Sequence, residues 1–130
     1  MQSSFWVVVW KRNIAERAHR LRQGSQTVGR STECEVHLND PAVSRRHAEM
    51  TVTPGRVMLR DLGSRFGTYV DEDRVVEAWL NVGMRLRFGQ TILELVDSRR
   101  FQEILNAEDE EGSDITSPLN GAGMTSATGA

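Results

Sequence analysis

The stretch DPAVSRRHA at residues 40–48 decides how this chain folds and what it can bind, because it sets a turn signal, a hydroxyl and two guanidinium groups just before a strand-like run. Ser44, Arg45 and Arg46 are adjacent in it. A Gly-Arg pair lies upstream at residues 29–30, and the sequence SRFGT lies downstream at residues 64–68. The guanidinium group of arginine makes bidentate hydrogen bonds to phosphate oxygens and stays charged at any working pH. Three short polar loops at strand boundaries therefore predict recognition of a phosphate group without turnover.

The size and charge of the chain limit the remaining possibilities. It has 130 residues and a formal net charge of −2 at pH 7, which suits one domain with a tail and gives no reason to expect a nucleic-acid partner. The only cysteine, Cys34, rules out an internal disulfide and is expected to be a small buried apolar residue. The apolar run at residues 5–10 is too short to span a membrane. We expect an intracellular protein, nuclear or cytoplasmic, with no membrane contact.

Residues 5–96 consist of short runs separated by Gly, Pro, Asn or Asp, which predicts an all-β domain. Met84, Leu86 and Phe88, for example, alternate with two arginines. Many short strands at this spacing are typical of a β-sandwich or a barrel. The strands expected from the sequence are 5–10, 17–22, 26–29, 35–38, 48–53, 57–61, 68–70, 84–88 and 91–96.

The basic segment at residues 11–22 is ambiguous. Ile14, Ala18 and Leu21 also fit one face of a helix. Its lysine and four arginines allow a nucleic-acid contact, but a solvated strand and loop agrees better with the overall charge.

The composition changes after Val96. Ser98 is expected to cap a short helix, with Phe101, Ile104 and Leu105 on one face. An acidic run follows at residues 108–111, and from residue 112 onward Gly, Ser, Thr and Ala predict a disordered tail. The expected organisation is a domain at residues 1–97, a short helix and acidic segment at 98–111, and a tail at 112–130.

Three motifs in order now identify a family. The Gly29-Arg30 pair, the Ser44-x-x-His47 pattern and the run DLGSRFGTYV at residues 61–70 together resemble the forkhead-associated (FHA) domain. The resemblance covers about residues 5–96. It implies an FHA-type β-sandwich of about eleven strands. It also implies binding of a phosphothreonine-containing protein or peptide through loops at one end of the sandwich.

The resemblance also assigns roles to individual residues. It implies contact with the phosphopeptide from Arg30, Ser44, Arg45, Ser64, Arg65 and Phe66. It implies structural support of the loops from Gly29, His47, Gly67 and Thr68. Taken alone, Ser44 can instead cap a turn, and one of Arg45 and Arg46 faces solvent if a strand alternates there.

Phe66 is a departure from the family pattern, which usually has asparagine at that position. The amide contact to the ligand backbone cannot be made by a phenyl ring. Nibrin-type FHA domains are similar to this chain in carrying an aromatic residue there. Phe66 either contacts peptide from the loop tip or packs beneath the loop, and we favour packing. The alternative function is an FHA-like structural or dimerisation module that has lost phosphopeptide binding.

No enzyme, cofactor or metal is expected from the sequence. His47 has no Cys or carboxylate partner at ligand spacing, and the only lysine, Lys11, follows no glycine-rich nucleotide loop. Thr116 in the tail offers a route to self-association: if phosphorylated, it can occupy a neighbouring molecule's site.

Overall fold

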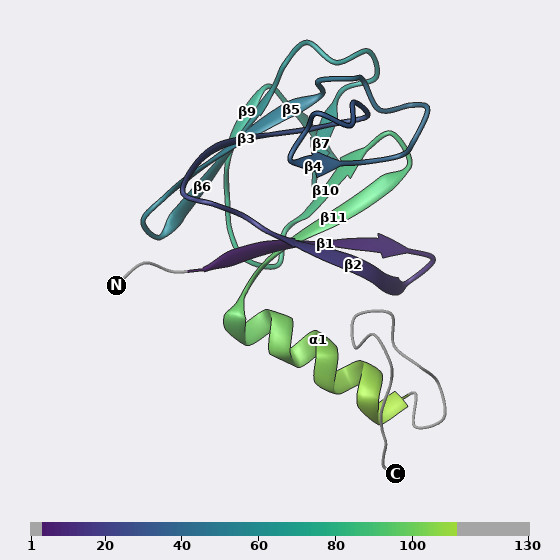
Figure 1. Cartoon of the computed structure of the whole chain (residues 1–130), viewed down its shortest axis with the longest axis vertical. Helices are drawn as coiled ribbons and strands as arrows, with labels where there is room; N and C mark the ends of the chain where they lie inside the picture. Colours follow the sequence, from purple (N-terminus) through teal and green to yellow (C-terminus); the bar gives the residue numbers. More distant parts are fainter. Residues whose placement is uncertain (1–3, 112–130) are drawn as a thin grey trace.

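The computed structural model describes residues 4–111, and these residues form two β-sheets with one helix at the end of the chain (Figure 1). The first sheet has the order β2-β1-β11-β10-β7-β8, and the second has the order β4-β3-β5-β6-β9. The strands are β1 Phe5–Lys11, β2 Ile14–Arg20, β3 Gly24–Gly29, β4 Val36–His37, β5 Ala48–Thr53, β6 Arg56–Asp61, β7 Thr68–Val70, β8 Asp73–Val75, β9 Glu77–Leu80, β10 Arg85–Phe88 and β11 Thr91–Asp97, and the helix is α1 Ser98–Glu111. The predicted β-sandwich of about eleven strands with a short C-terminal helix is confirmed. The predicted disordered tail and Thr116 lie outside the described residues.

The alternation of apolar residues explains why the two sheets pack face to face. In β5, Ala48, Met50 and Val52 are buried while the residues between them are partly exposed. Leu86 and Phe88 of β10 are buried in the same way from the opposite sheet, and both belong to one core cluster with the β5 residues. A residue period of two places one face of each strand in the core.

The ambiguous segment at residues 11–22 forms a hairpin arm and not a helix. Arg12 and Asn13 have φ angles of +52° and +66°, which is the left-handed backbone of a two-residue hairpin turn. This turn sends β2 back along β1, so the strand spans Ile14–Arg20 and not residues 17–22 as expected.

Two strands were not anticipated. β8 and β9, at Asp73–Val75 and Glu77–Leu80, are largely exposed edge strands in which only Leu80 is buried. A strand that buries almost nothing leaves no hydrophobic alternation for sequence reasoning to find.

The helix α1 packs against the outer face of the first sheet. Val8 points away from the main core, yet it is buried, because it forms a second cluster with Val96 and Ile104. Trp6 and Phe101 stack beside this cluster with ring centroids 5.1 Å apart. No helix within residues 4–111 is long and apolar enough to cross a membrane.

Asp97, not Ser98, caps the helix: its carboxylate accepts a hydrogen bond of 2.9 Å from the Arg100 N–H, so the expected cap was one residue too late.

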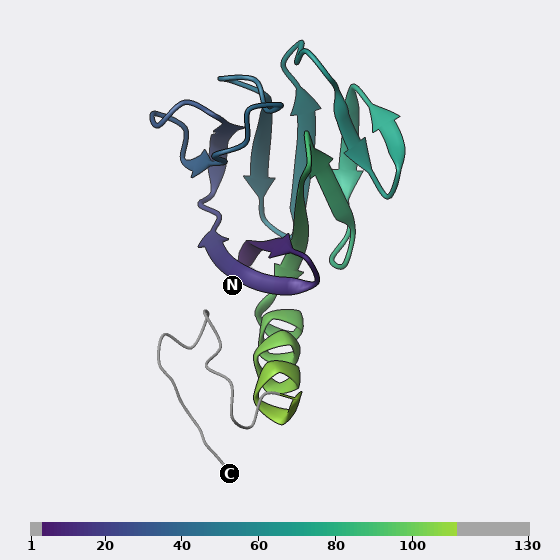
Figure 2. The ribbon, with the colours of Figure 1, turned by 90° about the vertical axis from the view of Figure 1, so that its right-hand side faces the viewer.

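The loops that carry the predicted site lie at the end of the sandwich opposite α1. In Figures 1 and 2 the connections β3–β4, β4–β5 and β6–β7 occupy the upper end, and the helix extends from the lower end. The fold therefore gathers three loops that are distant in sequence.

Candidate functional site

The first two loops of the site are held together backbone to backbone. The Arg30 N–H donates to the Ser44 carbonyl at 3.0 Å, and the Ser31 N–H donates to the Arg45 carbonyl at 3.1 Å. Gly29 makes this approach possible, since a Cβ built there would lie 2.1 Å from the Arg45 carbonyl oxygen. Any side chain at residue 29 would therefore separate the two loops.

Arg30 and Ser44 are brought to the same place by these contacts. The Arg30 Nε–H donates to the Val43 carbonyl at 2.9 Å, which orients the guanidinium of an otherwise exposed side chain and leaves its terminal N–H groups for other acceptors. The Ser44 Oγ accepts a hydrogen bond of 3.0 Å from the Arg65 N–H. Because that contact uses a lone pair, the hydroxyl proton of Ser44 stays available to an anion.

His47 ties the second loop to the third. Its side chain is 0% exposed. The Nδ1 atom accepts from the Ser44 N–H at 3.0 Å, and the Nε2–H donates to the Gly67 carbonyl at 2.9 Å. These two bonds define a neutral imidazole with its proton on Nε2. The ring also packs edge-on against Phe88 of the core, so both loops are anchored to the sandwich.

Asp61 organises the third loop, and sequence reasoning had given it no role. Its carboxylate accepts hydrogen bonds from the Ser64 hydroxyl at 2.6 Å, the Thr68 hydroxyl at 2.7 Å, and the N–H groups of Gly63 and Ser64 at 2.9 and 3.1 Å. Burial raises the pKa of this carboxyl and is the largest single influence. The hydrogen bonds from Ser64, Thr68 and Gly63 together outweigh burial and lower the pKa below its ordinary value. The run Asp61-x-Gly-Ser was the available signal, since Asp commonly accepts from N–H groups two and three residues later.

The hydroxyl group of Ser64 is therefore already hydrogen-bonded within the loop. Its hydroxyl donates to Asp61 and accepts a 3.0 Å hydrogen bond from the Gly67 N–H. In this arrangement its proton is not free for a ligand. Thr68 is fully buried beside it, and its hydroxyl proton also goes to Asp61.

The exposed part of the site is basic. Arg45 and Arg46 lie in a turn and both side chains are exposed, so the strand alternation expected for this pair does not apply. Arg65 is exposed as well, with its Cζ atom 5.2 Å from the centroid of the Phe66 ring. Phe66 is 52% exposed, and the preferred expectation that it packs beneath the loop was wrong. It lies at the loop tip.

Arg74 of β8 is a further neighbour that the sequence did not reveal. Gly67 has a φ of +92°, and a Cβ built there would lie 2.6 Å from the Arg74 Nε atom. The Arg74 side chain therefore lies against the glycine that the third loop requires.

Cys34 supports the site from beneath. It is buried as predicted, and its thiol donates to the Arg45 carbonyl at 3.2 Å. Burial raises the pKa of this thiol and outweighs the nearby Arg46 charge, which lowers it. Among the side chains described within residues 4–107, no group of three or more His, Cys, Asp or Glu is arranged to hold a metal ion.

Comparison with known proteins agrees with this geometry. The family model for the FHA domain matches residues 26–89. Similar proteins include an oxoglutarate dehydrogenase inhibitor of Corynebacterium efficiens, 37% identical over 70 residues that make up 54% of this chain and 49% of the relative. The glycogen accumulation regulator GarA of Mycolicibacterium smegmatis is also 37% identical over 70 residues, 54% of this chain and 44% of the relative. The chain thus spans about half the length of these relatives.

Two solved structures extend the comparison over most of the sandwich. One comes from a structural and functional analysis of phosphothreonine-dependent FHA domain interactions; it is 31% identical, with a TM-score of 0.69 over 72% of this chain and 96% of that chain. The other is the FhaA FHA domain complexed with the intracellular domain of Rv3910; it is 31% identical, with a TM-score of 0.65 over 70% of this chain and 98% of that chain. Two sheets in the same arrangement, three loops meeting at one end and this degree of identity lead to one conclusion: the chain belongs to the FHA family.

Proposed function

We propose that this chain is a phosphothreonine-dependent interaction module that binds a phosphorylated partner protein through the loops opposite α1. The observation that carries the proposal is the joint presentation of the Arg30 guanidinium and the Ser44 hydroxyl on loops fixed by Gly29 and His47. A phosphothreonine carries close to two negative charges and three strong acceptor oxygens. The similar FHA structure studied for phosphothreonine-dependent interactions supports the same class of ligand.

The individual contacts follow from the donors left free. Arg30 and Ser44 bind the phosphate oxygens, and Arg45 and Arg65 add charge from the exposed side of the loops. Phe66 contacts the peptide from the loop tip. Ser64 acts with Gly29, His47, Gly67 and Thr68 as support, because its hydroxyl is used by Asp61. Charge-assisted hydrogen bonds contribute about 1.5–3 kcal/mol each, so two or three of them, less the cost of association, suit a reversible complex.

The wider setting of the module is also a proposal. We infer a non-enzymatic regulator, divided into the FHA domain at residues 1–97, the helical segment at 98–111 and the tail at 112–130. The relatives named above are bacterial, which favours an intracellular protein in a cytoplasm over a nuclear one and limits the nibrin resemblance to the aromatic residue at Phe66.

A calorimetric titration with one threonine peptide in phosphorylated and unphosphorylated form tests the proposal. We expect binding of the phosphorylated form only, and a loss of about 30-fold or more for Arg30→Ala, because at least one strong charge-assisted contact disappears. Arg99→Ala is the matched control, since Arg99 is an exposed arginine of α1. Equal binding of the two peptide forms would refute the function and favour a structural or dimerisation module, which sedimentation would then reveal.

A further inference from the structure

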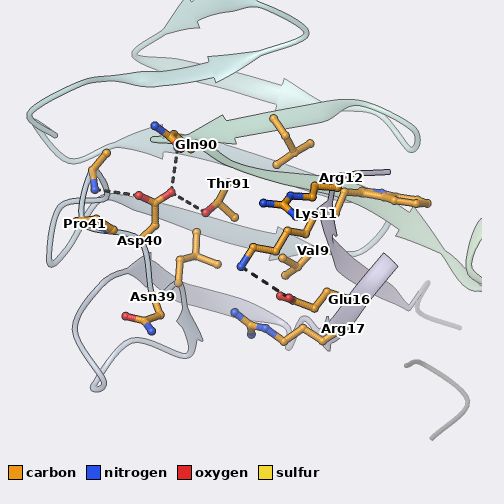
Figure 3. Close-up of a pocket in the computed structure, with 14 residues that line it drawn as sticks. Val9, Lys11, Arg12, Glu16, Arg17, Asn39, Asp40, Pro41, Gln90 and Thr91 are labelled. Carbon is orange, nitrogen blue, oxygen red and sulfur yellow. Dashed lines mark hydrogen bonds and ion pairs between the residues drawn. The ribbon is translucent and has the colours of Figure 1, made fainter. Parts of the chain in front are cut away.

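A second basic hollow lies beside the proposed phosphate site. It has a volume of about 700 Å³ and is bounded by the β1–β2 hairpin, the loop after β4 and the β10–β11 turn (Figure 3). Lys11, Arg12 and Arg17 contribute to one wall, and Asn39, Asp40 and Gln90 contribute to the other. None of these residues belongs to the three motifs that define the phosphate site.

The cationic side chains of this hollow are only weakly compensated. Lys11 approaches Glu16 no closer than 3.9 Å, and both side chains are largely exposed. Arg17 donates to the His37 carbonyl at 2.9 Å and contacts the His19 ring nitrogen, and these neutral partners hold the side chain without neutralising it. Arg12 makes no ion pair with any of the side chains described within residues 4–107. Figure 3 shows the three side chains reaching toward the same space from the hairpin.

The one carboxylate on the facing wall, that of Asp40, already accepts hydrogen bonds from its own surroundings. Asp40 accepts hydrogen bonds from the Ala42 N–H, the Gln90 N–H and the Thr91 hydroxyl at 2.8–2.9 Å (Figure 3). Burial raises the pKa of Asp40, but these three donors together lower it further, so the group is a satisfied anion. An incoming anion therefore meets three cations and two carboxylates, of which Glu16 is exposed and Asp40 already accepts three hydrogen bonds.

A fixed segment of chain links the hollow to the phosphate site. Asp40 pins the start of this segment to the β10–β11 turn, and at its other end the Val43 carbonyl holds Arg30. The four residue steps from Asp40 to Ser44 span at most about 14 Å. An extended peptide covers that distance with about four residues. The cations lie on the wall opposite Asp40, so a peptide that reaches them needs up to about three residues more.

We propose that this hollow binds an acidic segment of the same phosphorylated partner, located about four to seven residues from the phosphothreonine. The inference rests on the proposed function and adds a second requirement to it: the partner carries aspartate, glutamate or a second phosphoryl group at that spacing. We expect a preference of about fivefold to tenfold, which corresponds to about 1–1.4 kcal/mol and lies within what three exposed charge pairs contribute together.

The test is a titration of four phosphothreonine peptides that differ only in their flanks, each with its unphosphorylated counterpart, and of a DNA duplex. One carries an acidic run four to seven residues before the phosphothreonine, one carries it after, one carries it on both sides, and one has glutamines in all those positions. The wild-type chain should bind at least one acidic peptide about fivefold to tenfold more tightly than the glutamine peptide, with a preference that weakens as salt increases. The double variant Lys11→Glu with Arg12→Glu should lose that preference and bind the glutamine peptide unchanged.

Arg99→Glu is the control for negative charge added away from the hollow, because it changes the net charge in the same direction, by half as much as the double variant, on a side chain that is 89% exposed in α1. It should retain the preference. Thermal unfolding verifies that the hairpin variants fold.

The outcomes separate the two proposals. Phosphate-dependent binding with no acidic preference overturns the second site only, as does equal loss of both peptide classes in the double variant. Binding of an unphosphorylated acidic peptide or of duplex DNA at the hollow also overturns it, since the hollow would then act alone. Absence of phosphate dependence in all four peptides refutes both proposals.

Discussion

At the scale of single residues, the site depends on which lone pairs and protons are already used. Ser44 gives a lone pair to the Arg65 N–H and keeps its proton, whereas Ser64 gives its proton to Asp61. Two serines of similar sequence context therefore have opposite capacities. Only the first can donate to a phosphate without breaking a contact of the folded loops.

Ser44→Ala should weaken phosphopeptide binding by about tenfold or more, because one charge-assisted hydrogen bond is lost. The change also leaves the Arg65 N–H, which is exposed, to bond with water, so the free energy of unfolding should change by less than about 1 kcal/mol. Fluorescence anisotropy and denaturant unfolding measure the two effects. A variant that binds as tightly as the wild type would remove Ser44 from the site.

Ser64→Ala should show the reverse pattern. The Asp61 carboxylate and the Gly67 N–H both lose a partner, so we expect a loss of about 1–3 kcal/mol in unfolding free energy. Binding should weaken only as far as the third loop becomes disordered, and saturating peptide should restore most of it. A large binding loss with unchanged stability would make Ser64 a direct contact.

At the scale of elements, loops that share no sequence neighbourhood are fixed by two polar anchors. His47 connects the second loop to the third, and Asp61 closes the third loop on itself. His47 bonds to backbone groups at both ring nitrogens, and Asp61 bonds to backbone N–H groups and to side-chain hydroxyls. The loops therefore behave as extensions of the two sheets.

The Asp61 anchor makes the stability of this loop depend on pH. Because the folded-state pKa of Asp61 is lowered, its stabilising contribution is fully present above the unfolded value of about 3.9 and is lost as the pH falls through the folded value. Wild-type unfolding free energy should therefore decrease as the pH falls below about 4 and through the folded pKa of Asp61. Asp61→Asn should be less stable at neutral pH and should show a flatter profile over that interval.

Hydrogen exchange of the Gly63, Ser64 and Gly67 amides identifies the loop as the source of this dependence. Asp40 titrates in the same direction, so Asp40→Asn is the comparison that separates the two carboxyls. Identical pH profiles for wild type and Asp61→Asn would contradict the assignment.

At the scale of the whole molecule, α1 completes a second, smaller core on the outside of the first sheet. Glu94 is 2% exposed, and its carboxylate pairs with the Arg100 guanidinium at 2.7 Å while accepting from the Trp10 indole at 3.1 Å. The helix thus brings a cation to an anion that the strand has already buried. A buried carboxylate that loses its partner is costly.

Arg100→Ala should destabilise the protein by more than Glu94→Gln does. The first change leaves Glu94 buried with only the Trp10 indole and a distant Arg85 at 4.0 Å, whereas the second leaves a partly exposed arginine that can reach water. We expect about 2–4 kcal/mol for Arg100→Ala and about 1–2 kcal/mol for Glu94→Gln. Phosphopeptide affinity should be unchanged in both, because α1 lies at the opposite end from the loops, and loss of affinity would contradict that separation.

The sequence alone was sufficient to predict the strands in which apolar side chains alternate with polar ones and are buried. Alternating strands such as β5 and β10 were predicted within one residue, and the motif residues Arg30, Ser44 and His47 lie in loops that meet. The edge strands β8 and β9 escaped prediction because their side chains are mostly exposed. Residues that act through contacts distant in sequence also escaped it: Arg74 lies against Gly67 only after β7 and β8 pair.

The bridge formed by His47 between Ser44 and Gly67 has a consequence for the kind of protein that can be recognised. Because these loops are already fixed before binding, they lose little conformational entropy when a ligand binds. Most of the entropy cost of ordering therefore falls on the bound peptide. A stable helix or strand that contains the threonine would have to unfold before the threonine could bind to these loops. Suitable modification sites should therefore occur in linkers and tails that have no fixed shape beforehand.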